Sequence, residues 1–100
     1  MSDADQRWQD ALARARRQDV LAEVGRERSR QEQLKAEGKF TYTCADAEMT
    51  DGQRLAVLVE EVGEVARAMN DGKGLRDELI QVAAVAVAWV EAIDTAEAKS

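Results

Sequence analysis

Two apolar segments around a glycine-rich turn, within Val57–Ile93, constrain the fold more than any other part of the sequence. The turn is Asp71-Gly-Lys-Gly74, and because the chain contains no proline, neither segment is interrupted by a helix breaker. In and just before the first segment, apolar residues recur at helical spacing and predict a core face: Leu55, Leu58, Val62, Val65 and Met69. In the second, only Gln81 is polar between Leu79 and Val90, which predicts a helix buried on nearly every side. The stretch therefore predicts an antiparallel helical hairpin.

The N-terminal part, residues 1–37, also favours helix. Ser2 and Asp5 have the spacing of an N-terminal capping box. Gly25 and the polar patch Gln18–Asp19 are compatible with a kink or a break in this helix. The sequence therefore predicts a helix that is either continuous or broken. Charges of both signs alternate along it, which is typical of a solvated face; the alternative is that one or two of its arginines touch a substrate.

Residues 38–49 form the one segment without a helical pattern, and we expect an ordered loop there. Phe40 and Tyr42 alternate as in a strand, but a lone strand would have no partner. These aromatic side chains either pack the loop onto the helices or stack on a nucleobase. A capping box that begins at Thr50 then opens the hairpin, residues 50–98. The sequence as a whole predicts a single all-α domain.

Composition excludes several classes of protein. The net charge is −6, with most of the excess acid after residue 40, so the chain lacks the basic stripe that grips nucleic acid. Cys44 is the only cysteine and no targeting pattern opens the sequence, so we expect a cytoplasmic protein. The charge-free run Leu79–Val90 is too short to span a bilayer, and we expect no membrane partner. A core rich in alanine and valine buries little area per residue, which favours association with a second copy.

Acidic residues stand where the hairpin would otherwise be apolar. Glu60, Glu61 and Glu64 lie within one helical sector of the first segment, and Glu78 and Gln81 follow on the second. The simple alternative is a solvated face, but the three glutamates repel one another and antiparallel packing brings the two groups to nearly the same height. Clustered carboxylates without histidine or a thiolate select a hard cation, Mg²⁺ or Mn²⁺. A di-iron bundle is excluded because it requires Glu-x-x-His.

These residues carry a resemblance to a known family. The run Glu60-Glu61-Val-Gly-Glu64, a spacer of thirteen residues, and then Glu78-Leu-Ile-Gln81 followed by an alanine- and valine-rich helix resembles the MazG-like branch of the all-α NTP pyrophosphohydrolases. The family motif is E-E-x-x-E, a spacer, and E-x-x-D. The run Glu27–Gln31 is also similar to the family's N-terminal helix, and the likeness covers about residues 19 to 95.

The resemblance implies Mg²⁺-dependent hydrolysis of a nucleoside triphosphate to a monophosphate and pyrophosphate, in a house-cleaning or nucleotide-pool role. It implies a homo-oligomer, dimer or tetramer, in which subunits pack their hairpins into four-helix arrangements. By position, Glu61, Glu64 and Glu78 would be metal ligands. Glu60 would orient or deprotonate the attacking water, or hold a second ion.

One position departs from the family motif, because Gln81 stands where the motif has Asp. A glutamine carbonyl still ligates Mg²⁺, but the site loses one negative charge and would bind the ion more weakly. The alternative function is therefore a catalytically inactive helical oligomer that binds nucleotide or acts as a scaffold.

Three basic residues are candidates for binding the substrate phosphates: Arg67, Lys73 and Arg76. For Arg67 the alternative is an ordinary i,i+3 ion pair with Glu64, and for the other two an ordinary turn and helix start.

Overall fold

The structure is a computed structural model, and it describes residues 2–100. That part of the chain forms three helices and no strand: α1 (Asp3–Ala36), α2 (Asp51–Asp71) and α3 (Leu75–Ala98). The predicted all-α class is confirmed. α1 runs without a break through Gly25, so the continuous alternative is the observed one.

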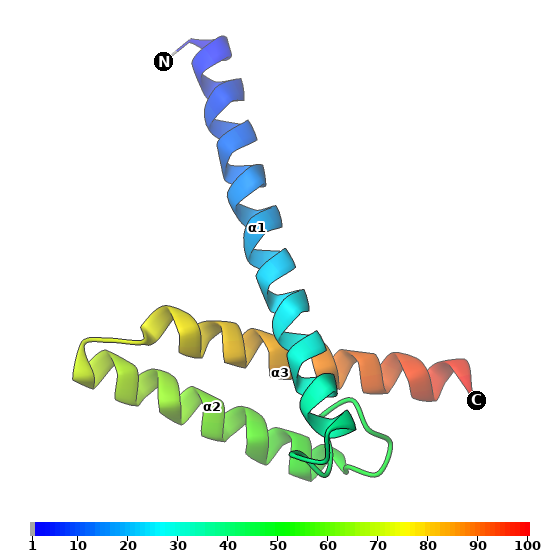
Figure 1. Cartoon of the computed structure of the whole chain (residues 1–100). Helices are drawn as coiled ribbons and strands as arrows, with labels where there is room; N and C mark the ends of the chain where they lie inside the picture. Colours follow the sequence, from blue (N-terminus) through cyan, green and yellow to red (C-terminus); the bar gives the residue numbers. More distant parts are fainter. Residues whose placement is uncertain (1) are drawn as a thin grey trace.

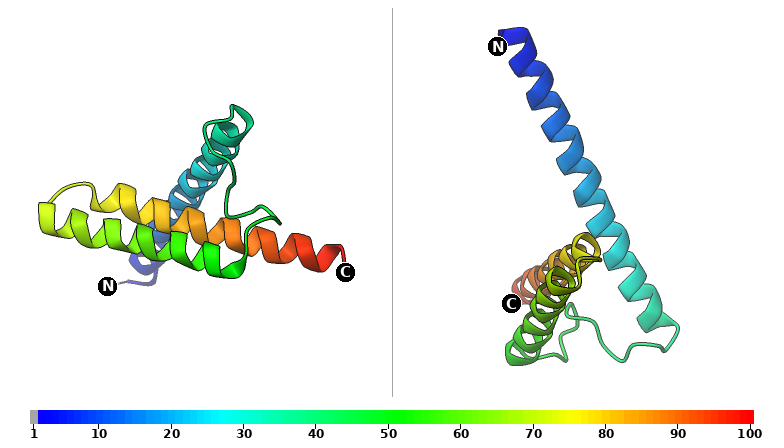
Figure 2. Two further views of the ribbon diagram at one scale, coloured as in Figure 1. Left: turned by 90° about the horizontal axis from the view of Figure 1, so that it is seen from below. Right: turned by 90° about the vertical axis from the view of Figure 1, so that its left-hand side faces the viewer.

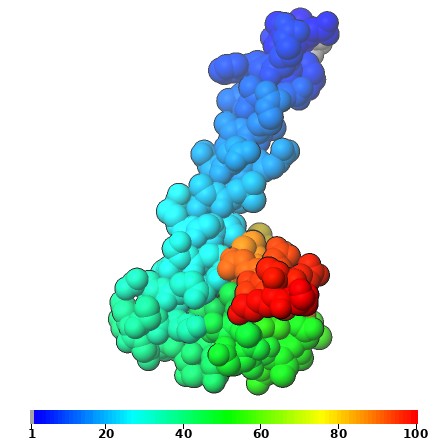
Figure 3. All heavy atoms as spheres, turned by 90° about the vertical axis from the view of Figure 1, so that its right-hand side faces the viewer, coloured from blue at the N-terminus to red at the C-terminus, as the bar shows by residue number. Residues whose placement is uncertain are grey.

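The three helices form a hairpin with a third helix laid across it (Figures 1 and 2). α2 and α3 run antiparallel, side by side, and α1 packs on α3 rather than directly on α2. Only the C-terminal half of α1 takes part in this packing. Its N-terminal half projects away from the hairpin as an arm, on which Trp8 is 63% exposed (Figure 3).

The helix ends follow from local chemistry. The hydroxyl of Thr50 accepts from the backbone N–H of Gln53, and the Gln53 side chain accepts from the Thr50 N–H, so the predicted capping box opens α2. The capping box of Ser2 opens α1 in the same way. Gly72 and Gly74 both have positive φ, 72° and 81°, and together they turn the chain between α2 and α3.

The core is built from small residues. Ala84 and Ala88 of α3 are fully buried, and with Val85 they let the neighbouring elements approach α3 closely. Cys44 of the loop packs onto Val85 and Ala88, with Met49, Val57 and Leu58 against the same cluster.

Two apolar stripes predicted to be buried are exposed in the single chain. On α2 the predicted core face is wrong at three of its five positions, because Leu55, Val62 and Met69 are 51%, 51% and 66% exposed. The helix is instead rotated so that its buried residues, Arg54 and Ala68, lie on another sector. α3 is not buried on nearly every side, since three large apolar residues on it are also about half exposed: Leu79, Val90 and Ile93.

A buried arginine joins α1 to α3. Arg28 is 6% exposed, and its guanidinium donates to both carboxylate oxygens of Glu91 at 3.0 and 2.9 Å. It also donates to Glu32 at 2.8 Å and to Gln31 at 2.9 Å. The expectation of a solvated face is therefore wrong for Arg28, which is a structural contact between helices.

We expect Arg28→Ala to lower the free energy of unfolding by about 2–3 kcal/mol, because it removes several charge-assisted hydrogen bonds and the packing of a buried side chain. Urea unfolding followed by circular dichroism measures the change. The matched control is Arg26→Ala, an exposed arginine two positions away, which should cost no more than about 0.5 kcal/mol. Equal losses in the two variants would contradict the structural role.

α3 is, by length and composition alone, long and apolar enough to cross a membrane, with a mean hydropathy of 1.6 in its most apolar window. In this structure the same helix packs against both other helices and bonds Arg28 through Glu91. In the single chain, 22% of that window is buried.

Candidate functional site

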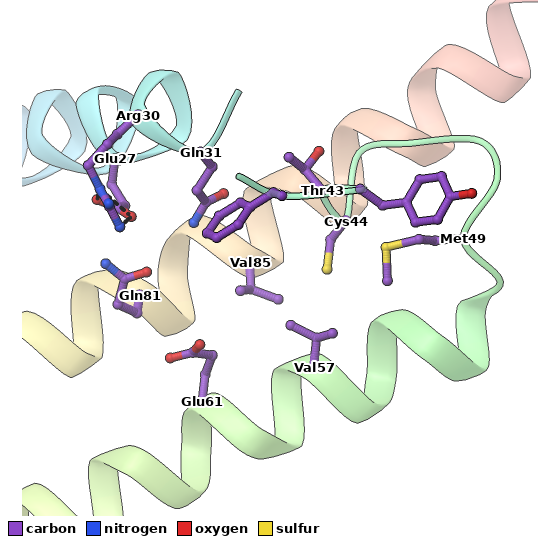
Figure 4. A pocket seen from close by; sticks show the side chains of 12 residues that line it. Glu27, Arg30, Gln31, Thr43, Cys44, Met49, Val57, Glu61, Gln81 and Val85 are labelled. Atoms are coloured by element: carbon purple, nitrogen blue, oxygen red, sulfur yellow. Dashed lines mark hydrogen bonds and ion pairs between the residues drawn. The ribbon is translucent and has the colours of Figure 1, made fainter. Parts of the chain in front are cut away.

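A cavity of about 200 Å³ lies where α1, the loop and the hairpin meet (Figure 4). Its apolar side is formed by the loop and the hairpin: Phe40, Tyr42, Cys44, Met49, Val57 and Val85. Its polar side carries charged and amide groups from all three helices: Glu27, Arg30, Gln31, Glu61 and Gln81. The cavity therefore offers an apolar surface beside a group of carboxylate and amide oxygens.

The loop that closes this cavity is held by a second buried arginine. Arg54 is 7% exposed and donates to the backbone oxygens of Cys44 and Asp46 at 2.8 and 2.6 Å. Thr43 of the loop donates to Glu32 of α1 at 2.7 Å. These contacts fix the loop on both sides, as expected for an ordered loop. The aromatic side chains remain partly exposed on the cavity, with Phe40 41% exposed.

Glu61 is the central residue of the site. It lies on α2 and points toward Gln81 of α3 across the cavity (Figure 4). Burial raises the pKa of the Glu61 carboxyl above its ordinary value, and the neighbouring carboxylates raise it further, Glu78 most strongly and then Glu64, Glu60 and Glu27. Acids of both hairpin helices therefore contribute to the electrostatic environment of Glu61.

The remaining acids divide between two surfaces. Glu64 and Glu78 line a shallow hollow next to the turn together with Arg67 and Lys73, and Glu64 pairs with Arg67 at 3.1 Å. Glu60 is exposed and lines neither of these two hollows.

The three basic candidates differ in their placement. Arg67 and Lys73 lie in the hollow beside Glu64. Arg76 does not: it pairs with Glu23 of α1 at 2.6 Å. Arg76 therefore joins the start of α3 to α1, a contact that neither the phosphate-binding role nor an ordinary helix start predicted.

The donor chemistry of the site fits a hard divalent cation. Carboxylate and amide side chains line the cavity with Glu61. Burial and the neighbouring carboxylates both raise the pKa of Glu61, and a cation would compensate the effect of the carboxylates. As the side chains are placed, however, no three acidic or cysteine side chains within residues 2–100 are close enough to share one ion. Glu64 is directed to Arg67, so holding a cation requires that side chain to change rotamer.

One residue of the site was not predicted from the sequence. Glu27 enters the cavity from α1 and faces Gln81 (Figure 4). The hydrogen bond from Arg30 lowers the pKa of the Glu27 carboxyl, burial opposes this effect, and the amide of Gln81 also lowers it. The available signal was a stripe on α1, because Glu27 and Gln31 follow Val24 at helical spacing.

Cys44 is a buried residue of the core. It is 7% exposed, and burial raises the pKa of its thiol, which keeps the thiol protonated.

The sequence matches no known family model, and neither a curated protein nor a solved structure matches the chain. The resemblance in the acidic motif is therefore a basis for a proposal only.

The raised pKa of Glu61 has a consequence for stability. In the folded state this carboxyl holds its proton to higher pH than in the unfolded chain, so ionisation opposes folding as the pH rises above the ordinary value of 4.5. We expect Glu61→Gln to increase the free energy of unfolding near neutral pH when a chelator removes divalent ions. The gain should vanish well below pH 4.5, where Glu61 is protonated in both the folded and the unfolded state.

Urea unfolding at the two pH values tests this expectation. Glu97→Gln is the matched control, because Glu97 is exposed near the end of α3 and is not among the carboxylates that raise the pKa of Glu61. A stability gain for Glu61→Gln that is equal at both pH values would show that the carboxylate charge is not its cause.

Proposed function

We propose that the protein is a Mg²⁺-dependent nucleoside triphosphate pyrophosphohydrolase, which cleaves a (d)NTP to (d)NMP and pyrophosphate. The observation that carries the proposal is the position of Glu61. Its carboxylate stands at the junction between an apolar cavity and the acids of both hairpin helices. A nucleotide has the same two parts, a flat base and a chain of phosphates that binds a divalent cation.

The proposed contacts with the base, the cation and the phosphates are divided between the two hollows. The cavity under the loop receives the base against the loop aromatics, as Phe40 and Tyr42 line it. Glu61, Glu64 and Glu78 would hold the cation, with Gln81 beside them. The bound ion would supply charge neutralisation for the phosphates and a Lewis acid for the bond that breaks.

Arg67 and Lys73 lie on the far side of the acids from the base cavity, in the hollow next to the turn. In this proposal they would bind the β and γ phosphates, after Arg67 leaves Glu64 and pairs with the substrate. Glu60, on the exposed side of the same helical turn, would orient the attacking water. Arg76 is left out of the proposed substrate contacts because of its pairing with Glu23.

A homo-oligomer is part of the same proposal. The half-exposed apolar stripes on α2 and α3 give the hairpin a face that a second copy would cover, in the four-helix packing that the resemblance implies.

The test is an incubation of the purified chain with Mg²⁺ and a panel of ribo- and deoxyribonucleoside triphosphates. We expect monophosphate and pyrophosphate in equal amounts, with no diphosphate, and no reaction in the presence of a chelator. Release of diphosphate and phosphate instead would contradict cleavage between the α and β phosphates.

The second candidate is a helical oligomer without catalytic activity, favoured by Gln81 at the position of the family Asp. Gln81→Asp separates the two, since it restores the motif. If neither the natural chain nor Gln81→Asp releases pyrophosphate from any nucleotide, the catalytically inactive oligomer explains the structure better than the enzyme does.

A further inference from the structure

On the side of α1 and the loop, the cavity has few polar groups that are free to meet a base. Thr43 donates its hydroxyl to Glu32 at 2.7 Å, and both carboxylate oxygens of Glu27 accept hydrogen bonds from Arg30. The amide of Gln31 on α1 also lines the cavity. Its hydrogen bonds determine which end of the amide is available to a ligand.

The orientation of the Gln31 amide is fixed by a buried neighbour. The guanidinium of Arg28 donates to the Oε1 atom of Gln31 at 2.9 Å. A guanidinium has donors and no acceptor, so the amide atom that it bonds is the oxygen and not the nitrogen. Arg28 is itself held by the two carboxylate oxygens of Glu91. The oxygen of Gln31 is therefore occupied, and its N–H₂ group points toward the cavity (Figure 4).

A purely structural role explains only one end of this amide. The oxygen completes the hydrogen bonds of Arg28, but within residues 2–100 no hydrogen bond of ordinary geometry takes up the N–H₂ group. The lowered pKa of Glu27 has its largest cause in the hydrogen bond from Arg30, and Gln31 adds the smallest contribution. An amide nitrogen carries two N–H donors, so at least one of them is available to a ligand.

Gln31 lies across the cavity from Glu61. The two residues come from α1 and α2, which do not pack on each other, and Val85 of α3 lies between them (Figure 4). In the proposed function the phosphates lie toward Glu61, so the base edge remote from the sugar faces Gln31. That edge carries a carbonyl oxygen in guanine, hypoxanthine, thymine and uracil, and an amino group in adenine and cytosine.

We propose that Gln31 selects nucleotides whose base presents a carbonyl oxygen at this edge over those with adenine or cytosine. This inference rests on the proposed function, because it places the base in this cavity. A free glutamine recognises adenine with both ends of its amide, but here Arg28 occupies the oxygen and leaves only donors. Arg28 is therefore a positioning residue, which keeps the amide from turning its oxygen to the ligand.

The test compares nucleotides that differ chiefly in this one group, inosine with adenosine and uridine with cytidine. Calorimetry with a chelator present measures the binding of their monophosphates without catalysis. We expect the inosine and uridine nucleotides to bind about tenfold tighter than their amino counterparts, because an amino group opposite the N–H₂ group loses a hydrogen bond. The values of kcat/KM for the corresponding triphosphates with Mg²⁺ should show the same preference.

Gln31→Glu keeps an acceptor for Arg28 and replaces the N–H₂ donors with a carboxylate oxygen. We expect it to reverse the preference, so that the adenosine and cytidine monophosphates bind more tightly than their partners. Gln33→Glu is the matched control, since it makes the same change at an exposed residue of α1 outside the cavity, and it should leave the ratios unchanged. A merely structural role of Gln31 would alter stability, measured by urea unfolding, without reversing the ratios.

The outcomes separate this inference from the proposed function. If triphosphates release pyrophosphate but both members of each pair bind and react alike, or if Gln31→Glu leaves the ratios unchanged, the inference is overturned and the proposed function stands. If Gln31→Glu reverses a preference in binding but no triphosphate is hydrolysed, the inference holds and the catalytic step is wrong. If no nucleotide binds or reacts, both are wrong.

Discussion

Glu61→Gln and Glu78→Gln should each lower the rate of pyrophosphate release about a hundredfold or more, with helical content unchanged. Each substitution removes a negative oxygen from the point where the two hairpin helices meet, while the amide keeps the size of the side chain. The reaction would lose charge stabilisation at the phosphates, and added Mg²⁺ would recover only part of the rate. Steady-state assays over a range of Mg²⁺ concentrations measure the loss.

The matched control is Asp94→Asn, which neutralises an exposed acid near the far end of α3 and should leave the rate unchanged. Normal rates in either glutamine variant would show that the ligand assignment is wrong. Equal losses in Asp94→Asn would indicate that overall charge, rather than a local site, controls the reaction.

The helix ends could be predicted closely from the sequence because they depend on local chemistry. The capping box at Thr50 sets the start of α2, and Gly72 ends it with a positive φ that other residues rarely adopt. The same reasoning placed the loop and the start of α3. These features need only the backbone and a few neighbouring side chains, so one sequence contains enough information.

The rotation of α2 could not be predicted because the helix has two plausible inner faces. The apolar periodicity favoured the side of Val62, whereas the structure turns Glu61 and Ala68 inward. Periodicity finds an apolar stripe but does not say whether it meets the same chain or another copy. Glu61 is therefore less exposed than Leu55, Val62 or Met69 of the predicted core face.

The contribution of α1 to the site could not be predicted, for a related reason. Its charges alternate evenly in the sequence, so Glu27 and Arg28 look like their neighbours. Only the crossing of α1 over α3 selects among them, placing Arg28 against Glu91 and Glu27 against Gln81. The stripe of Val24, Glu27 and Gln31 was the available sequence signal, but a stripe of this kind does not identify the element that the helix contacts.

The exposed stripes lead to the last prediction, which concerns association. On α3, Leu79, Val90 and Ile93 lie about 100–160° around the helix from Glu91, the residue that bonds α1. They therefore lie well away from α1 on α3, where a second hairpin can approach. We expect the natural chain to sediment as a dimer or larger, and Val62→Glu or Val90→Glu to sediment as a monomer.

The physical reason is the cost of a charge in an apolar interface. A two-fold interface repeats each substitution, so one added glutamate places two unpaired carboxylates between the copies. Val20→Glu is the matched control: Val20 is also exposed, at 41%, but lies on α1 outside the stripes, and its substitution should leave association unchanged. A natural chain that sediments as a monomer would show that the stripes are ordinary apolar surface. The candidate site would then have to work with the residues of one copy alone.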